Sequence, residues 1–211
     1  MKRFFVADTH FGCKTRLIRS MARCYPGSHK LFPSAKEMDV YLIDAINCKV
    51  KPEDELHILG DFSAEPTRYR QRIKCKHVYL TRGNHDPVQK SQNVFGPNIP
   101  FQREVKLRGT DGHLHCILSH SPQAFWFGSH KGWAHLYGHT HGQREVTLDQ
   151  WLGKERRSMD VGVDNIRMLT GNYFPFDEQE LYAILIGRSG HDHPAFYLGY
   201  QAERDHKYGF K

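Results

Sequence analysis

The sequence predicts an α/β fold built on a parallel β-sheet. Three short apolar runs, at 4–7, 55–59 and 76–81, are separated by two segments of helical character. A β-α-β-α-β order with right-handed crossovers gives a parallel sheet. Each run stops at polar residues, and the carboxyl ends of parallel strands share one edge of the sheet. With 211 residues, 39% of them hydrophobic, the chain can form one globular domain with a full core.

The first apolar run, 4–7, is followed directly by Asp8, Thr9 and His10. Residues two apart on an extended chain share a face, so Asp8 and His10 can point at one place. Taken alone, the pair is better explained as an Asx turn beside a surface histidine. Its interpretation therefore depends on what the other strands carry.

Two helices are predicted between the first three strands. Ser34 and Glu37 form a predicted capping box at the start of the first helix. Five residues at helical spacing are expected to form its buried stripe: Met38, Tyr41, Leu42, Ala45 and Ile46. The second helix is expected over 66–75. The second and third strands end in Gly60-Asp61 and in Arg82-Gly83-Asn84-His85-Asp86.

The second half of the chain predicts more strands. Residues 87–100 are expected to form a loop, and 101–107 with 113–118 a hairpin around the turn 109–112. We expect His113 and His115 on an exposed sheet face and not as ligands. The hairpin is followed by His120, and a short strand at 134–137 is followed by His139 and His141. A strand at 159–163 and a helix at 176–185, with Asp177 as N-cap and leading to a final strand, complete the domain.

Net charge and cysteine usage limit the classes of binding partner and the cellular compartment that we expect. The net charge is +7 with a pI near 9.2, which suits an anionic substrate and allows nucleic acid, although a solvated basic surface explains it equally well. The five cysteines include no C-x-x-C pair, which favours a reducing compartment. No apolar run is long enough to cross a membrane. We therefore expect a cytoplasmic protein without membrane attachment.

Polar side chains follow five of the predicted strands. They are Asp8 with His10, Asp61, Asn84 with His85, His120, and His139 with His141. Carboxylate, amide and imidazole without thiolate suit Mn, Fe, Zn or Ni. These ligands are too many for one ion, whereas two ions sharing a carboxylate would use them all. We expect manganese first, and a net positive site that binds phosphate oxygens strongly.

The order of these motifs resembles that of the calcineurin-like metallophosphoesterase superfamily, in particular its small bacterial and phage members. The motifs that carry the resemblance are Asp8-x-His10, Gly60-Asp61, Gly83-Asn84-His85-Asp86, Ser119-His120 and Gly138-His139-x-His141, followed by Asp160-Val161-Gly162-Val163-Asp164. The resemblance implies a sandwich of two facing mixed β-sheets flanked by helices. It also implies a single domain over 1–211, with a motif core at 4–186 and a polar, aromatic extension at 187–211.

The resemblance further implies a role for each motif residue. One metal would be bound by Asp8, His10, Asp61 and His141. The other would be bound by Asp61, Asn84, His120 and His139, with Asp61 as the bridging ligand. A hydroxide between the metals would attack phosphorus, and His85 would protonate the leaving oxygen or steady the phosphate.

The chain departs from the family pattern at two places. Protein phosphatases of the superfamily continue as Gly-Asp-x-x-Asp-Arg, whereas this chain has Ala64 and Glu65 at the last two positions. The aspartate that orients the catalytic histidine and the arginine that grips phosphate are both missing, which argues against phosphoprotein phosphatase activity. Cys13 stands where many relatives have histidine.

The substrate is predicted less sharply than the reaction. Basic residues at 14–30 and aromatic residues at 125–133 favour a phosphodiester with a base to stack, such as a nucleotide, a cyclic nucleotide or a nucleic-acid end. Arg16, Arg82 and Trp126 are the candidate substrate contacts. A small phosphomonoester is the alternative substrate, and a non-enzymatic protein-binding scaffold is the alternative class of function.

Overall fold

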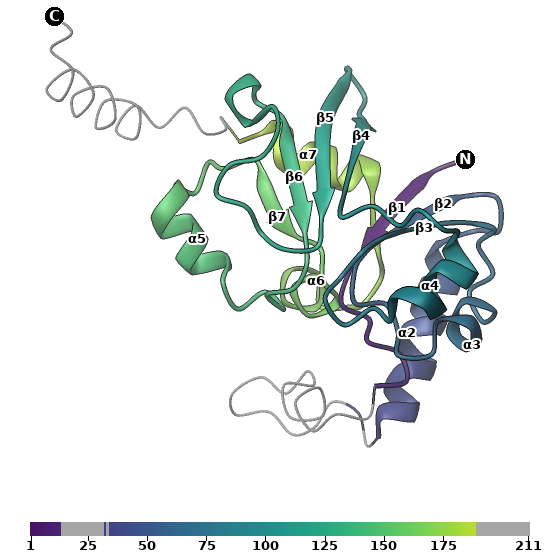
Figure 1. Cartoon of the computed structure of the whole chain (residues 1–211). Helices are drawn as coiled ribbons and strands as arrows, with labels where there is room; N and C mark the ends of the chain where they lie inside the picture. The colour runs from purple at the N-terminus through teal and green to yellow at the C-terminus, as the bar shows by residue number, and fades with distance from the viewer. Residues whose placement is uncertain (14–31, 33, 189–211) are drawn as a thin grey trace, which may run out of the picture.

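The computed structural model describes residues 1–13, 32 and 34–188 (Figure 1). The candidate contact Arg16, the rest of the basic segment at 14–30 and nearly all of the C-terminal extension lie outside these residues. No helix in the described ranges is long and apolar enough to cross a membrane.

The first sheet contains the three predicted parallel strands. β1 (Arg3–Val6), β2 (Glu55–Leu59) and β3 (His77–Thr81) pair in parallel, and β8 (Phe176–Asp177) pairs with β1 in the opposite direction. The strand order is β3-β2-β1-β8, so the sheet is mixed. The carboxyl ends of β1, β2 and β3 therefore lie at the same edge, as predicted.

The second sheet is also mixed and has the order β4-β5-β6-β7. β4 (Gln102–Arg108) and β5 (His113–Ser119) form the predicted antiparallel hairpin. β6 (Ala134–Tyr137) and β7 (Ser158–Asp160) continue the sheet in parallel with β5. The two sheets and their helices form an α/β sandwich, which confirms the predicted fold class.

The helices surround the two sheets in Figure 1. α2 (Ala35–Lys49), α3 (Pro66–Arg70) and α4 (Val88–Phe95) lie beside the first sheet, and α5 (Glu145–Leu152) lies beside the second. α6 (Val163–Thr170) follows β7, and α7 (Glu178–Ile186) contacts β1 and β8 of the first sheet and β4 and β5 of the second. A short 3-10 turn, η1, covers Ser129–Lys131.

Several predicted boundaries are wrong for local reasons. The expected loop at 87–100 contains α4, which begins after Pro87 and ends at Gly96, where φ is 95°. The helix predicted over 66–75 ends at Arg70, and the strand predicted over 159–163 ends at Asp160 because Gly162 caps α6. The last helix begins two residues later than predicted because its first residues pair with β1 as β8, so the final strand precedes this helix.

The hydrophobic core lies between the sheets and under α2. Four of the five residues predicted for the buried stripe of α2 are buried, whereas Tyr41 is 50% exposed. Its ring packs against Phe32 and Tyr173 at the surface. Ser34 is the N-cap, and its hydroxyl accepts the Glu37 amide, which is half of the predicted capping box; the Glu37 carboxylate accepts the Ser34 hydroxyl and not its backbone amide.

The two sheets meet at the end of β1. Ala7 donates its amide to Val161 O at 3.0 Å, and its carbonyl accepts the Val163 amide at 3.0 Å. These bonds form a parallel bridge between Ala7 and Gly162. The loop that carries Asp8 is therefore held against the segment that follows β7.

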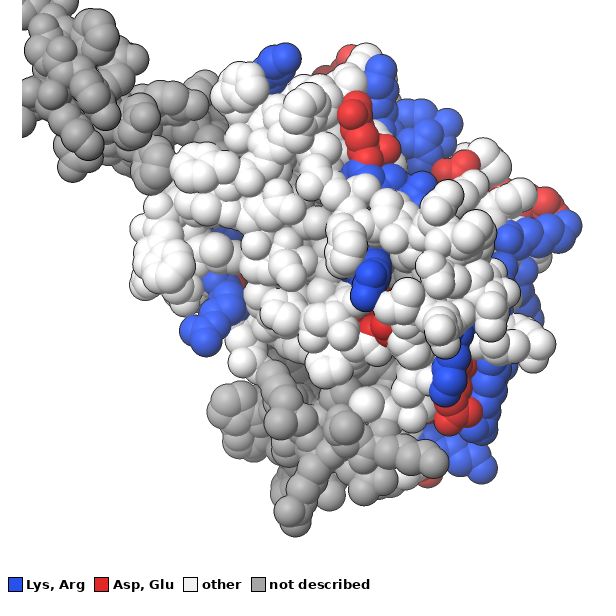
Figure 2. Space-filling model, in the orientation of Figure 1, with Lys and Arg blue, Asp and Glu red and all other residues white. Residues whose placement is uncertain are grey.

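Charge is unevenly distributed over the face shown in Figure 2. Lys and Arg lie mainly along the right-hand side of this view, with Asp and Glu interspersed among them. The mixture indicates a solvated surface there and not a continuous basic stripe.

A buried histidine in β2 makes the stability of the fold depend on pH. His57 is 5% exposed, and its ring lies between Phe5 and Tyr79 with centroids 5.1 Å from each. Burial, assisted by the charges of Arg103 and Arg3, lowers the pKa of His57 to about 3. The unfolded chain binds this proton near pH 6.5, so the contribution of His57 to stability is complete above that pH and is lost as the pH falls toward 3.

We expect the substitution His57→Phe to protect the fold against acid. The free energy of unfolding of the variant, relative to wild type, should rise by about 2–3 kcal/mol between pH 7.5 and pH 4.5. Urea unfolding at the two pH values measures this difference, with the exposed His113→Phe as the matched control. If the variant and wild type differed in free energy of unfolding by the same amount at both pH values, the low pKa assigned to His57 would be contradicted.

Candidate metal centre

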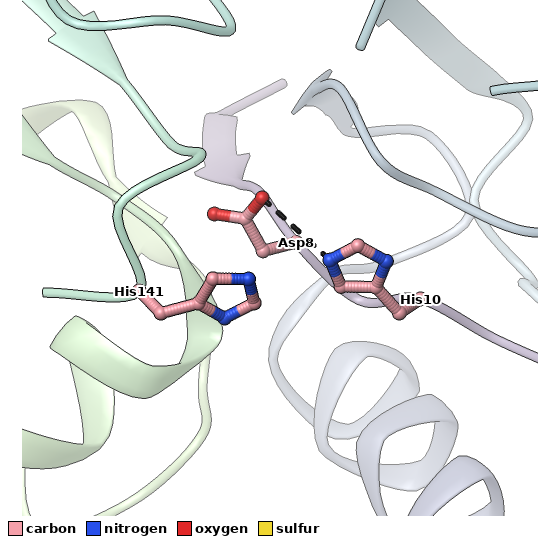
Figure 3. A group of neighbouring side chains, drawn as sticks. All are labelled: Asp8, His10 and His141. Atoms are coloured by element: carbon pink, nitrogen blue, oxygen red, sulfur yellow. Dashed lines mark ion pairs between the residues drawn. The ribbon is translucent and has the colours of Figure 1, made fainter. Parts of the chain in front are cut away.

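The predicted ligands converge at the edge where the strands of both sheets end. The structure places six of them in two groups. Within each group, the ligand atoms lie within 4.8 Å of one another. The first group is Asp8, His10 and His141, and the second group is Asp61, His120 and His139. Figure 3 shows the first group, in which side chains from the loops after β1 and β6 point into the same space. The two groups match the ligand division implied by the family resemblance.

Asp61 lies between the groups. Its Oδ2 is 3.6 Å from Nε2 of His10 in the first group and 3.3 Å from Nε2 of His120 in the second. Its Oδ1 accepts the backbone amide of His85 at 2.8 Å, which fixes the carboxylate. One oxygen therefore faces both groups, the position required of a bridging ligand.

Asn84 joins the second group through its side-chain oxygen. Its Oδ1 is 2.8 Å from Nε2 of His120, while Nδ1 of the same histidine is 2.9 Å from the carbonyl of Leu59. Burial alone would lower the pKa of His120, but the hydrogen bond to Asp61 and the charges of Asp8 and Asp61 raise it to about 9. Metal binding at this group would therefore displace a proton.

His85 lies beside the ligands but belongs to neither group. Its side chain is exposed, and its ring meets the ring of His10 edge-on with centroids 5.6 Å apart. Ala64, where the family pattern has an orienting aspartate, is exposed. His85 is thus adjacent to both ligand groups, with its backbone amide bonded to Asp61 and its ring against the ring of His10.

The backbone of the site is strained at the ligands themselves. In the described part of the chain, every non-glycine residue with positive φ is a predicted ligand: Asp8 at 57°, His10 at 48°, Asp61 at 52°, His139 at 69° and His141 at 51°. Such conformations cost of order 1–3 kcal/mol each and gather at functional sites. This concentration supports a functional role for the edge.

Two glycines allow the loops to approach closely. A Cβ at Gly83 would lie 2.3 Å from the amide nitrogen and from Oδ1 of Asp61, and one at Gly138 would lie 2.6 Å from Oδ2 of Asp8. Any larger residue at either position would displace a predicted ligand.

The electrostatics of the site fit a divalent cation. Burial, followed by the nearby charge of Asp160, raises the pKa of Asp8 to about 8. Burial also raises the pKa of Asp160 to about 6, although three hydrogen-bond donors oppose it. For Asp61 the effect of burial is outweighed by His120, which lowers its pKa to about 2. A cation between these carboxylates would relieve their repulsion, and oxygen with imidazole donors suits a borderline or hard metal.

Three carboxylates that support the ligands were missed by sequence reasoning. Asp86 accepts the backbone amides of Asp61, Phe62 and Gly83. Asp160 accepts Thr140 Oγ1 and the amides of Gly142 and Gly162, and Asp164 bonds Nδ1 of His141. The sequence signal was present, because all three belong to the quoted motifs. For Asp160 and Asp164, that role required knowing that β7 ends beside the loop after β6; for Asp86, it required knowing that the loops after β2 and β3 meet.

The two candidate substrate contacts in the described residues are Trp126 and Arg82. Trp126 is 5% exposed, its ring stacks on His135, and its indole N–H donates to Trp133 O. It is an internal support, so its prediction as a substrate contact is wrong. The aromatic side chains that this loop exposes are Phe125 and Phe127.

Arg82 is half-buried. It directly precedes the Gly83-Asn84-His85 loop, and its guanidinium lies 4.8 Å from the ring centre of Phe101. His113 and His115 lie on β5 and in neither group; His113 is exposed as expected, whereas His115 is half-buried and its ring stacks on Trp133.

Comparisons with known proteins support the fold. No protein-family model matches the chain, and no curated protein matches it. The crystal structure of a protein of unknown function from Aquifex aeolicus has a TM-score of 0.62 and 18% sequence identity, covering 87% of this chain and 98% of that one. A single mutant of Vps29 from Entamoeba histolytica gives a TM-score of 0.37 at 16% identity, covering 67% and 65%, and adds nothing to the fold assignment.

Proposed function

We propose that the chain is a two-metal phosphoester hydrolase. The observation that carries the proposal is Asp61, whose Oδ2 faces histidines of two separate Asp/His groups. Two divalent ions in these groups would supply positive charge for phosphoryl oxygens and would acidify water. Manganese is the proposed metal, and iron, zinc or nickel would suit the same donors.

The residues of this chain would divide the work. The first group and the second group would each hold one ion, with Asn84 completing the second. His85 would stand beside the bound phosphate and deliver a proton to the leaving oxygen, because its ring is exposed next to the ligands without belonging to them.

A phosphodiester is the proposed substrate, with a nucleotide, a cyclic nucleotide or a nucleic-acid end as its chemical class. Support comes from the exposed rings of Phe125 and Phe127 and from Arg82 stacked on Phe101. Such rings could pack on a base, and the overall charge of +7 favours an anion. The described cysteines Cys48, Cys75 and Cys116 are free, which supports a reducing, cytoplasmic location.

The test is metal-dependent hydrolysis of bis-p-nitrophenyl phosphate and p-nitrophenyl phosphate. Protein stripped by chelation should be inactive and should recover with Mn²⁺, with higher kcat/KM for the diester. Asp61→Asn should lower kcat/KM by about 10³-fold, because several kcal/mol of charge stabilisation is lost. Asparagine tolerates the positive φ at this position, so the variant should fold.

Two results would separate this proposal from its alternatives. Equal or higher efficiency on the monoester would overturn the diester preference and favour a phosphomonoesterase. Absence of transition metal from the purified wild type, with no effect of Asp61→Asn, would favour a non-enzymatic scaffold.

A further inference from the structure

The histidines of the two groups are held by different kinds of partner. Nδ1 of His141 in the first group lies 2.6 Å from Oδ2 of Asp164. Nδ1 of His120 in the second group lies 2.9 Å from the backbone carbonyl of Leu59. Both bonds leave Nε2 directed toward the site. A carboxylate partner makes the imidazole a stronger metal ligand than a neutral carbonyl does.

The surrounding charge differs in the same direction. The first group contains the fully buried Asp8, which feels the charge of Asp160, and its His141 is backed by Asp164. The second group shares Asp61 with the first, and its additional oxygen donor is the neutral amide of Asn84. Among their own ligands, the first group therefore has the carboxylate of Asp8 in addition to the shared Asp61, whereas the second group has Asp61 alone.

Exposure differs as well. Two members of each group are buried, and the groups differ in the third member: His141 is half-buried, whereas His139 is exposed. Water and chelators would reach an ion in the second group more directly.

On the basis of the function proposed above, we propose that Asp164 is a positioning residue that makes the two metal positions unequal. The first group binds its ion first and keeps it, and the second group holds the exchangeable ion. Asp164 also lies in the first turn of α6, where an acidic side chain stabilises the helix. The experiment must therefore separate metal affinity from helix stability.

The experiment is calorimetric titration of the full, metal-stripped chain with Mn²⁺. Wild type should show two binding events of different affinity. Asp164→Asn, which keeps the shape of the side chain, should weaken the tighter event by about 10- to 100-fold and leave the other unchanged. Asn84→Ala should weaken the other event alone. Glu37→Gln removes an exposed acid from the first turn of α2 and should change neither event.

Thermal unfolding of the metal-free variants provides the second readout. A helix-stabilising role alone would lower the Tm of Asp164→Asn and leave both affinities intact, which would overturn the inference. Equal weakening of both events, or weakening of the looser one, would overturn it too. A wild type that binds no Mn²⁺ at all would instead overturn the proposed function, so the two failures are distinguishable.

Discussion

Replacing His85 with glutamine should lower kcat by about 10²- to 10⁴-fold while both metals stay bound. The imidazole belongs to neither ligand group, so its loss should not open a coordination position. Its backbone bond to Asp61 is retained in the variant, because that bond uses the amide and not the ring. Steady-state kinetics with metal counting by mass spectrometry measures both effects.

A comparison of two leaving groups distinguishes proton donation by His85 from binding of the phosphate. If the ring donates a proton, the loss in His85→Gln should be larger for a phenyl diester than for a p-nitrophenyl diester, whose leaving oxygen needs less help. A loss that is the same for both esters would show that the ring steadies the phosphate. Loss of a metal ion would mean that His85 is a ligand. His113→Gln, on the exposed start of β5, is the control histidine.

Replacing Asp86 with alanine should lower both the stability of the fold and the metal content of the site. Its two oxygens accept three backbone amides, from Asp61 at 3.0 Å, Phe62 at 2.8 Å and Gly83 at 2.8 Å. Each buried N–H left without an acceptor costs about 1–3 kcal/mol, so the loss of all three should lower the free energy of unfolding by about 3–9 kcal/mol. Urea unfolding in the presence of a chelator measures the loss without a contribution from metal.

Asp86→Asn is the matched variant for this prediction. Asparagine keeps one acceptor oxygen but presents an NH₂ group to the remaining amides, so its stability should be intermediate. Metal content should follow the same order, because these amides position the loop that carries Asp61. An Asp86→Ala protein as stable as wild type would show that the three amides find other partners.

The strand ends could be predicted from the sequence because the information there is local. An apolar run that stops at Gly60-Asp61 or Gly83-Asn84 predicts both a strand and its polar edge. Parallel pairing then brings separate runs to one place. The seven predicted ligands follow from that logic, with the family pattern supplying their division.

The supporting contacts could not be predicted, because they depend on how loops that follow different strands meet. The bond from Asp164 to His141 requires the end of β7 to lie beside the loop after β6. Trp126 was predicted as a substrate contact because its neighbours are aromatic, yet packing against His135 buries it. α4 was not predicted, because the Pro and Asn residues of 87–100 were interpreted as loop signals. Pro87 and Gly96 instead stand at the two ends of a helix.

The strained ligands place folding and function in opposition. Glycine would adopt the φ of Asp8, His10, Asp61, His139 or His141 at lower conformational cost, and would remove a donor each time. Selection for a more stable apoprotein alone would therefore replace these residues with glycine one at a time and remove the donor side chains. A chain without use for these five donors would gain stability from glycine at each position, so the strained set is what the proposed metal centre would cost the fold.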